Sequence, residues 1–213
     1  TRPLVAMQLL PGRRPADAAA LVPRLYALCG HAQGAACAAA LRAAGADAAG
    51  LPATDARVVM LEALQETLFR LLIDAPRALS LPPQAAAVGP ARAAVAAAIA
   101  ALQAGADPDQ AVPSQAAGTL AQVAHESVYG VAPADWLAAI DKAPAFDHWR
   151  DTADTVPART LARLAASAPD LCRSDTALMP GLDDDAWWSS VVPALQRDPL
   201  FARTPTWGGR PVE

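Results

Sequence analysis

Alanine dominates this sequence, and it constrains the fold more than any other feature. Hydrophobic residues make up 54% of the chain but aromatic residues only 5%, and long runs such as AAAVGPARAAVAAAIAAL (85–102) are mostly alanine. Alanine has the highest helix propensity, and its small side chain lets helices approach closely. Runs of β-branched residues, which favour strands, are almost absent. The sequence therefore predicts a mainly α, alanine-rich helical bundle, and its 213 residues suit a single helical domain over 1–213.

Proline, glycine and capping residues divide the chain into elements. Leu4 to Leu10 is short and apolar and is closed by Pro11-Gly12, which predicts a short peripheral strand. The predicted helices run from Pro15 to about Leu28, kinked or restarted at Pro23; from about His31 to Ala44; from Asp55 to about Asp74, with Thr54 as cap and an end before Pro76; from Pro90 to Gly105; from Ser114 to about Tyr129; from Pro133 through Ile140; and from Pro157 to Ser167. A further helix is expected after an acidic cap at Asp183 to Asp185, through Trp187, Trp188 and Val192, and an extended tail over 198–213, docked by Phe201 and Trp207.

Charge and cysteine content exclude several classes of partner and location. The net charge of −4 gives no electrostatic reason to expect nucleic acid or an anionic membrane surface. Three cysteines do not make a disulfide framework, and no signal peptide opens the chain, so we expect a reducing, cytoplasmic location. The longest apolar stretch, Val88 to Gly105, contains Pro90 and Arg92 and is interpreted as a helix of a soluble fold, not a membrane span.

The segment LYALCGHAQGAACAAALRAAG (25–45) concentrates the candidate chemistry. It holds Cys29, Cys37 and His31, with Cys29 and Gly30 at the predicted break between two helices. The positive end of a helix dipole favours a thiolate, which is the form that binds metals and acts as a nucleophile. Cys37 lies two turns from Cys29, at about 12 Å along a helix, so the two thiols cannot share one metal if both are helical. The competing interpretation, that both are small buried apolar side chains, is common for free cysteine.

Other polar clusters favour structural roles. Glu66 is expected to pair with Arg70 one turn away, leaving Glu62 on the same helix edge. His125 and Glu126, with the adjacent Ser127, diverge on a helix, so they do not form a catalytic set. The remaining polar or aromatic candidates are expected to be incidental, capping or core-anchoring residues: Cys172, Asp183 to Asp185, and the tryptophans at 136, 149, 187, 188 and 207.

Three segments together resemble nickel–iron hydrogenase large subunits: the cysteine segment (25–45), the helix RVVMLEALQETLFRLLIDAP (57–76) and the tail PTWGGRPVE (205–213). The resemblance is strongest to the shortened, non-catalytic maturation proteins of the HupK/HoxV type. Their Leu-Cys-Gly-x-Ala-Gln pattern is matched by Leu28 to Gln33, and their glutamate on the following helix is matched by Glu62. The resemblance implies a helical bundle related to the large-subunit fold. It also implies that the sequences of the relatives continue beyond the position that corresponds to Glu213.

Departures from the catalytic pattern argue against hydrogenase activity. Ala32 stands at the position of the second cysteine, Ala36 at that of the histidine, and no carboxy-terminal Cys-x-x-Cys follows. Nickel and iron together need four thiolates, which this chain lacks. The resemblance implies a scaffold, not an enzyme, that transiently holds an iron centre with cyanide and carbon monoxide ligands at Cys29. His31 or Gln33 would hydrogen-bond to the cyanides and Glu62 would face the same cavity.

The implied partners are HypC- and HypD-type maturation proteins and the hydrogenase large subunit. Two alternatives stay open. In the first, the chain is a structural docking protein for maturation chaperones, with an inert Cys29. In the second, it is a hydrolase or transferase with Cys29 as nucleophile and His31 as base, although no third orienting group is evident in the sequence.

Overall fold

The structure is a computed structural model that describes residues 8–105, 114–140, 143–167, 193, 197, 206–207 and 210–211. The chain divides into two compact units, 1–164 and 165–213. In the second unit, β1 (Thr206–Trp207) and β2 (Arg210–Pro211) form an antiparallel pair, with Thr206 opposite Pro211. Cys172, Phe201 and the predicted helix after Asp183 to Asp185 lie outside the described residues. The single-domain organisation stays a prediction.

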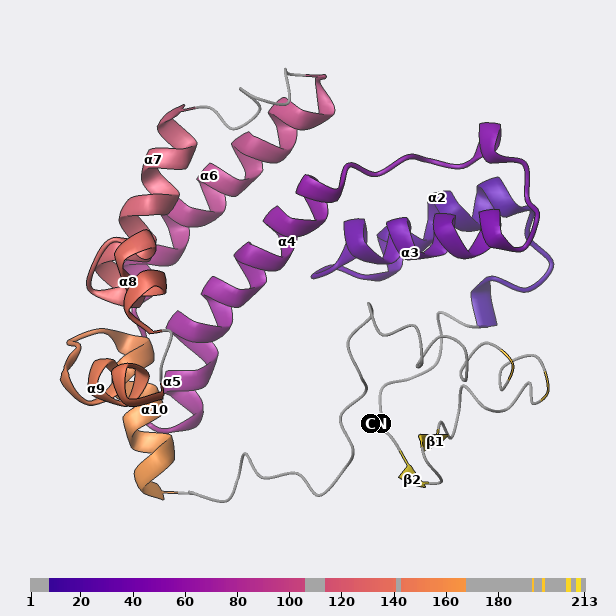
Figure 1. Cartoon of the computed structure of the whole chain (residues 1–213). Coiled ribbons are helices and arrows are strands. Elements are labelled where there is room, and N and C mark those ends of the chain that lie inside the picture. The colour runs from indigo at the N-terminus through magenta and orange to yellow at the C-terminus, as the bar shows by residue number, and fades with distance from the viewer. Residues whose placement is uncertain are drawn as a thin grey trace. The chain divides into compact units, whose positions relative to one another are not determined.

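The first unit is helical in its described residues, which confirms the mainly α prediction (Figure 1). Its elements are α2 (Pro15–Leu25), α3 (Gly30–Ala43), the 3₁₀ turn η1 (Ala48–Gly50), α4 (Ala56–Phe69), the π-helical segment η2 (Arg70–Asp74), α5 (Ala75–Ala78), α6 (Ala85–Gln103), α7 (Ser114–Val123), the π-helical segment η4 (Ala124–Tyr129), α8 (Pro133–Ala139), α9 (Ala143–Thr152) and α10 (Val156–Ser167). The helix α9 was not expected. The predicted strand over 4–10 is wrong where it is described, because Gln8 and Leu9 are helical.

Glycines end the helices where the sequence predicted. Gly45, Gly105 and Gly130 have φ values of +84°, +79° and +77°, the left-handed region that glycine adopts without a Cβ clash. The predicted cap of α4 is wrong. Asp55, not Thr54, is the N-cap, and its carboxylate accepts a hydrogen bond from the Arg57 backbone nitrogen. Hydrogen bonds from the Arg57 side chain and backbone lower the pKa of Asp55 to about 2.

Prolines interrupt the helices less than expected. α2 ends at Leu25 and passes Pro23 without restarting, and α6 begins at Ala85, five residues before Pro90. The helix from Ala56 does not end before Pro76 but continues through η2 to Ala78. Proline has no N–H to donate to the carbonyl four residues earlier. At Pro76 that carbonyl belongs to Leu72, and it accepts instead from the Gln84 backbone nitrogen at 2.9 Å.

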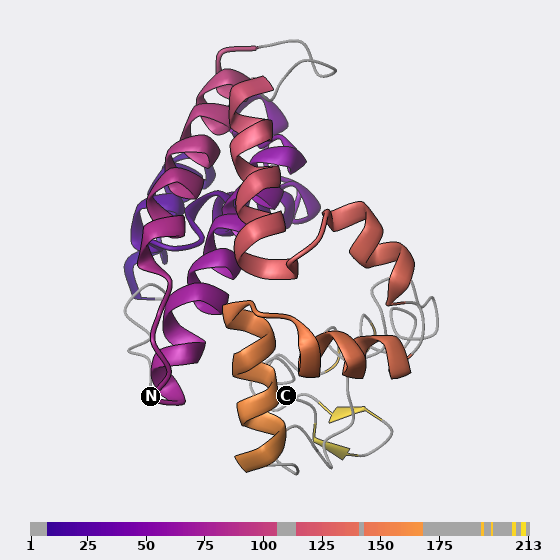
Figure 2. The same cartoon turned by 90° about the vertical axis from the view of Figure 1, so that its left-hand side faces the viewer.

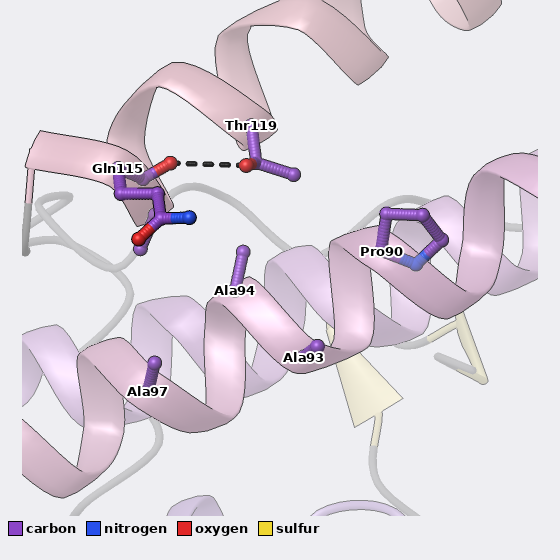
Figure 3. A pocket seen from close by; sticks show the side chains of 7 residues that line it. Pro90, Ala93, Ala94, Ala97, Gln115 and Thr119 are labelled. Carbon is purple, nitrogen blue, oxygen red and sulfur yellow. Dashed lines mark hydrogen bonds between the residues drawn. The ribbon is translucent and has the colours of Figure 1, made fainter.

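The main core lies where α4, η2, α6, α7, η4 and α10 meet. Its buried side chains are Leu68, Leu72, Ile73, Val88, Ala91, Val123, Val128 and Val156. α6 and α7 lie side by side and antiparallel in both views (Figures 1 and 2). Small side chains line the groove between these two helices, and the Thr119 hydroxyl is turned back to the Gln115 carbonyl at 3.0 Å (Figure 3). Alanine thus supplies most of the side chains that α6 presents to α7 in this groove.

α6 is the one helix among the described residues that is long and apolar enough to cross a membrane. Its mean hydropathy is 1.7 over the best window, of which 33% is buried. Val95 and Ala98 are fully buried in the protein. A core helix of a soluble protein meets the same criterion, so α6 is weak evidence for a membrane span.

Candidate functional site

Cys29 lies at the junction between α2 and α3, as the sequence predicted. It is the N-cap residue of α3, with φ −138° and ψ 38°, and its carbonyl accepts from the Gln33 backbone nitrogen at 2.9 Å. The side chain is half-buried. Close packing fixes this junction, because a Cβ on Gly30 would lie 2.7 Å from the Pro23 carbonyl oxygen. Glycine at the first position of α3 thus lets the two helices meet beside Cys29.

Glu62 of α4 caps the start of α3. One carboxylate oxygen accepts from the His31 backbone nitrogen at 3.0 Å, and the other accepts from the Ala32 backbone nitrogen at 2.9 Å. These are two of the N–H groups that a helix leaves without an intrahelical partner, and a carboxylate there also interacts favourably with the helix dipole. Glu62 therefore occupies the positive end of the α3 dipole.

Cys29 and Glu62 line the same open cavity, which has a volume of about 650 Å³. The cavity is bounded by the α2–α3 junction and one face of α4, and its lining residues are Leu25, Tyr26, Ala27, Leu28, Cys29, Ala32, Val59, Glu62, Ala63, Glu66, Thr67 and Arg70. Arg70 donates to Glu66 at 2.7 Å and also pairs with Asp74, which confirms the expected Glu66–Arg70 pair. The cavity thus joins a thiol to carboxylate, hydroxyl and guanidinium groups.

His31 and Gln33 do not line the cavity at Cys29. His31 lines a separate cavity of about 310 Å³ with residues of α4 and α6, among them Asp55 and Gln103. The structure therefore does not bring His31 to Cys29 as a base. His31 is already helical, and two residues apart on a helix point to different sides.

The remaining candidates lie apart from Cys29. Cys37 is a free, half-buried thiol of α3 outside the cavity lining. Ser127 is buried and accepts a hydrogen bond from the Gln84 side chain at 3.1 Å, whereas His125 and Glu126 are exposed. No group of three His, Cys, Asp or Glu side chains in the described part of the chain is placed to hold a metal ion.

Sequence reasoning missed Tyr26, Thr67 and Arg70 as lining residues of this cavity. The signal was present in part, because Glu62, Glu66 and Arg70 recur every four residues and so share one face of the continuous helix that α4 forms with the start of η2. Tyr26 gave no such signal, since it precedes Cys29 in the junction, where no helical period applies.

We predict that Glu62→Gln lowers the free energy of unfolding by about 1 kcal/mol. The glutamine oxygen replaces only one acceptor, and its NH₂ group meets the second backbone N–H, which then loses a charge-assisted hydrogen bond. Urea unfolding measures the loss, and amide exchange of His31 and Ala32 should accelerate. Glu66→Gln is the matched control, since its surface pair with Arg70 contributes little. Equal losses in the two variants would contradict the capping role.

Comparison with known proteins shows what this chain is similar to. The chain is 31% identical to the hydrogenase expression/formation protein HoxV of Cupriavidus necator, over an alignment that covers 100% of the chain and 54% of the relative. The chain therefore spans about half the length of this curated relative. No protein-family model matches the chain, and no solved structure matches it.

The chain is thus related to hydrogenase formation proteins. Within that class its relationship is to the HoxV type, which confirms the resemblance predicted from Leu28 to Gln33 and Glu62. The relation to the large-subunit fold stays a prediction.

Proposed function

We propose that this chain is an accessory scaffold in the maturation of nickel–iron hydrogenases. Its cargo is an iron centre with cyanide and carbon monoxide ligands, which Cys29 holds before the centre passes to the large subunit. The observation that carries the proposal is the half-buried thiol of Cys29 in an open cavity of about 650 Å³, in a chain related to HoxV. The proposed donors and acceptors of the cargo are HypC- and HypD-type proteins and the large subunit.

A single thiolate suits a cargo that must leave again. Thiolates are soft ligands that bind low-spin iron well. The cavity adds no second cysteine or histidine to Cys29. One protein ligand holds the iron less firmly than the four thiolates of a catalytic centre. A site with Cys29 as its single ligand therefore favours release of the iron centre over its retention.

The cavity offers hydrogen-bond donors to the cyanide nitrogens. The donors on its wall are the Tyr26 hydroxyl, the Thr67 hydroxyl and the Arg70 guanidinium. Charge-assisted hydrogen bonds are the stronger kind, which favours Arg70. In this proposal these three groups bind the cyanides in place of His31 and Gln33. The latter two residues were expected to be the donors but lie outside the cavity lining.

The test is anaerobic co-production with the hydrogenase maturation machinery, followed by purification, iron analysis and infrared spectroscopy. We expect the protein to carry iron with cyanide and carbonyl bands, and Cys29→Ala to lose both. Cys37→Ala is the matched control, because it removes a half-buried thiol of the same helix outside the cavity. Wild-type protein without iron or bands would overturn the proposal.

A purely structural docking role is the second candidate, and an exposed apolar side chain next to Cys29 favours it. Leu28 precedes Cys29 in the sequence and lines the cavity with 59% of its surface exposed. Maleimide labelling of the native protein separates the candidates, because a Cys29 that labels no faster than Cys37 at neutral pH favours an inert thiol. The third alternative, a hydrolase or transferase, lacks support in the geometry, since His31 lines a different cavity from Cys29.

A further inference from the structure

A second cavity, unrelated to Cys29, lies where η4, α8, α9 and the start of α10 come together. Its volume is about 500 Å³, within the range of binding pockets in proteins. The aromatic rings of Tyr129, Trp136 and Trp149 line it, together with the imidazole of His148 and the carboxylates of Glu126 and Asp154. In a chain with 5% aromatic residues, this concentration of rings marks a distinct chemical environment.

The three aromatic rings lie next to one another. Tyr129 and Trp136 have ring centroids 4.5 Å apart, and Trp136 and Trp149 are 5.3 Å apart at an interplanar angle of 74°. The Trp149 Nε1–H donates to the Tyr129 carbonyl at 2.7 Å, which fixes that ring. The Trp136 Nε1–H is buried and has no acceptor in the described part of the chain. Because this nitrogen is buried, it does not lie on the open surface of the cavity.

The charge in the cavity favours a cation. Glu126 accepts a hydrogen bond from the neutral Gln122 amide at 3.1 Å, and no described cation pairs with it. Asp154 is paired with Arg159. Aromatic faces attract ammonium and guanidinium groups, Trp most strongly, and a nearby carboxylate adds to that attraction.

The surface around the cavity is suited to a protein partner. Val131, on the cavity wall, is 45% exposed, and Leu137, which follows Trp136 in α8, is 64% exposed. Exposed large apolar side chains beside a pocket are typical of protein interfaces, where aromatic residues anchor the contact. A small organic cation would leave both side chains uncovered.

We propose that this aromatic cavity is a docking site for a segment of a partner protein that inserts an arginine or lysine side chain. The cationic head lies among the rings of Trp136 and Trp149 beside Glu126, and apolar residues next to it in the partner cover Val131 and Leu137. This site goes beyond the proposed iron-scaffold function and does not depend on Cys29.

The test uses two synthetic peptides, Ac-Leu-Arg-Leu-NH₂ and its neutral isostere Ac-Leu-citrulline-Leu-NH₂. Indole N–H resonances of the full-length, ¹⁵N-labelled protein report binding. We expect the arginine peptide to shift the Trp136 resonance and to bind about fivefold or more tightly than the citrulline peptide, the effect of one cation–π contact. Glu126→Gln should reduce this preference. Asp135→Asn, an exposed carboxylate of α8 outside the cavity, should leave it unchanged.

Three results would overturn the proposal. The first is equal binding of the two peptides, and the second is an arginine preference that survives Glu126→Gln. The third is methylguanidinium binding as tightly as the peptide, which would show a small-cation site. All three readouts are independent of iron loading, so failure of the scaffold proposal leaves them intact.

Discussion

Leu72→Ala is expected to lower the free energy of unfolding by about 3 kcal/mol, the largest loss among the substitutions considered. Leu72 is fully buried in η2, at the centre of the main core. Removing its three outer carbons loses the favourable free energy of burying them away from water. It also leaves a cavity, since the surrounding helices relax only in part. For a chain of this length the melting temperature should fall by roughly 6–12 °C.

Leu64→Ala is the matched control for this core prediction. Leu64 lies on α4, two turns before Leu72, but 38% of its surface is exposed, so its truncation should cost below about 1 kcal/mol. Urea unfolding followed by circular dichroism gives both values, and equal m-values would show that the denatured states are alike. If the two variants lose the same stability, the core is not centred on η2.

The helix ends were predictable because they depend on local chemistry. Gly45, Gly105 and Gly130 each adopt positive φ, and glycine is the residue that does so without strain. The path past Pro76 was not predictable, because it depends on the Gln84 backbone nitrogen reaching the Leu72 carbonyl. The π-helical segments η2 and η4 were also not predictable from the spacing of apolar residues. That spacing reflects a whole helix and hardly changes when a single turn is widened.

The sequence pointed to two of the residues that line the cavity but not to the contacts between them. The resemblance pointed to both Cys29 and Glu62, and they line one cavity. The bond from Glu62 to the backbone of His31 spans 31 positions of sequence, and no local pattern encodes such a contact. The sequence also did not show that His31 lines a different cavity from Cys29, because that cavity includes Leu102 and Gln103 of α6, which are distant in the sequence.

Gly30→Ala tests whether this junction depends on the close approach of α2 and α3. The added Cβ would lie 2.7 Å from the Pro23 carbonyl oxygen, a distance that forces backbone to move because no flexible side chain can give way. We expect a loss of about 1–3 kcal/mol in the free energy of unfolding, as for other overpacked sites. The displacement should also weaken the hydrogen bonds from His31 and Ala32 to Glu62, visible as shifted amide resonances.

Gly118→Ala separates this steric effect from the general effect of replacing a helical glycine. Gly118 lies within α7, and a Cβ there would meet nothing within 4 Å. Alanine reduces the freedom of the unfolded chain and raises helix propensity, so this variant should be more stable by about 0.5–1 kcal/mol. The two substitutions are the same in chemistry and are expected to differ in sign. A Gly30→Ala protein as stable as the wild type would show that α3 can shift away from Pro23, and that the placement of Cys29 does not require glycine at this position.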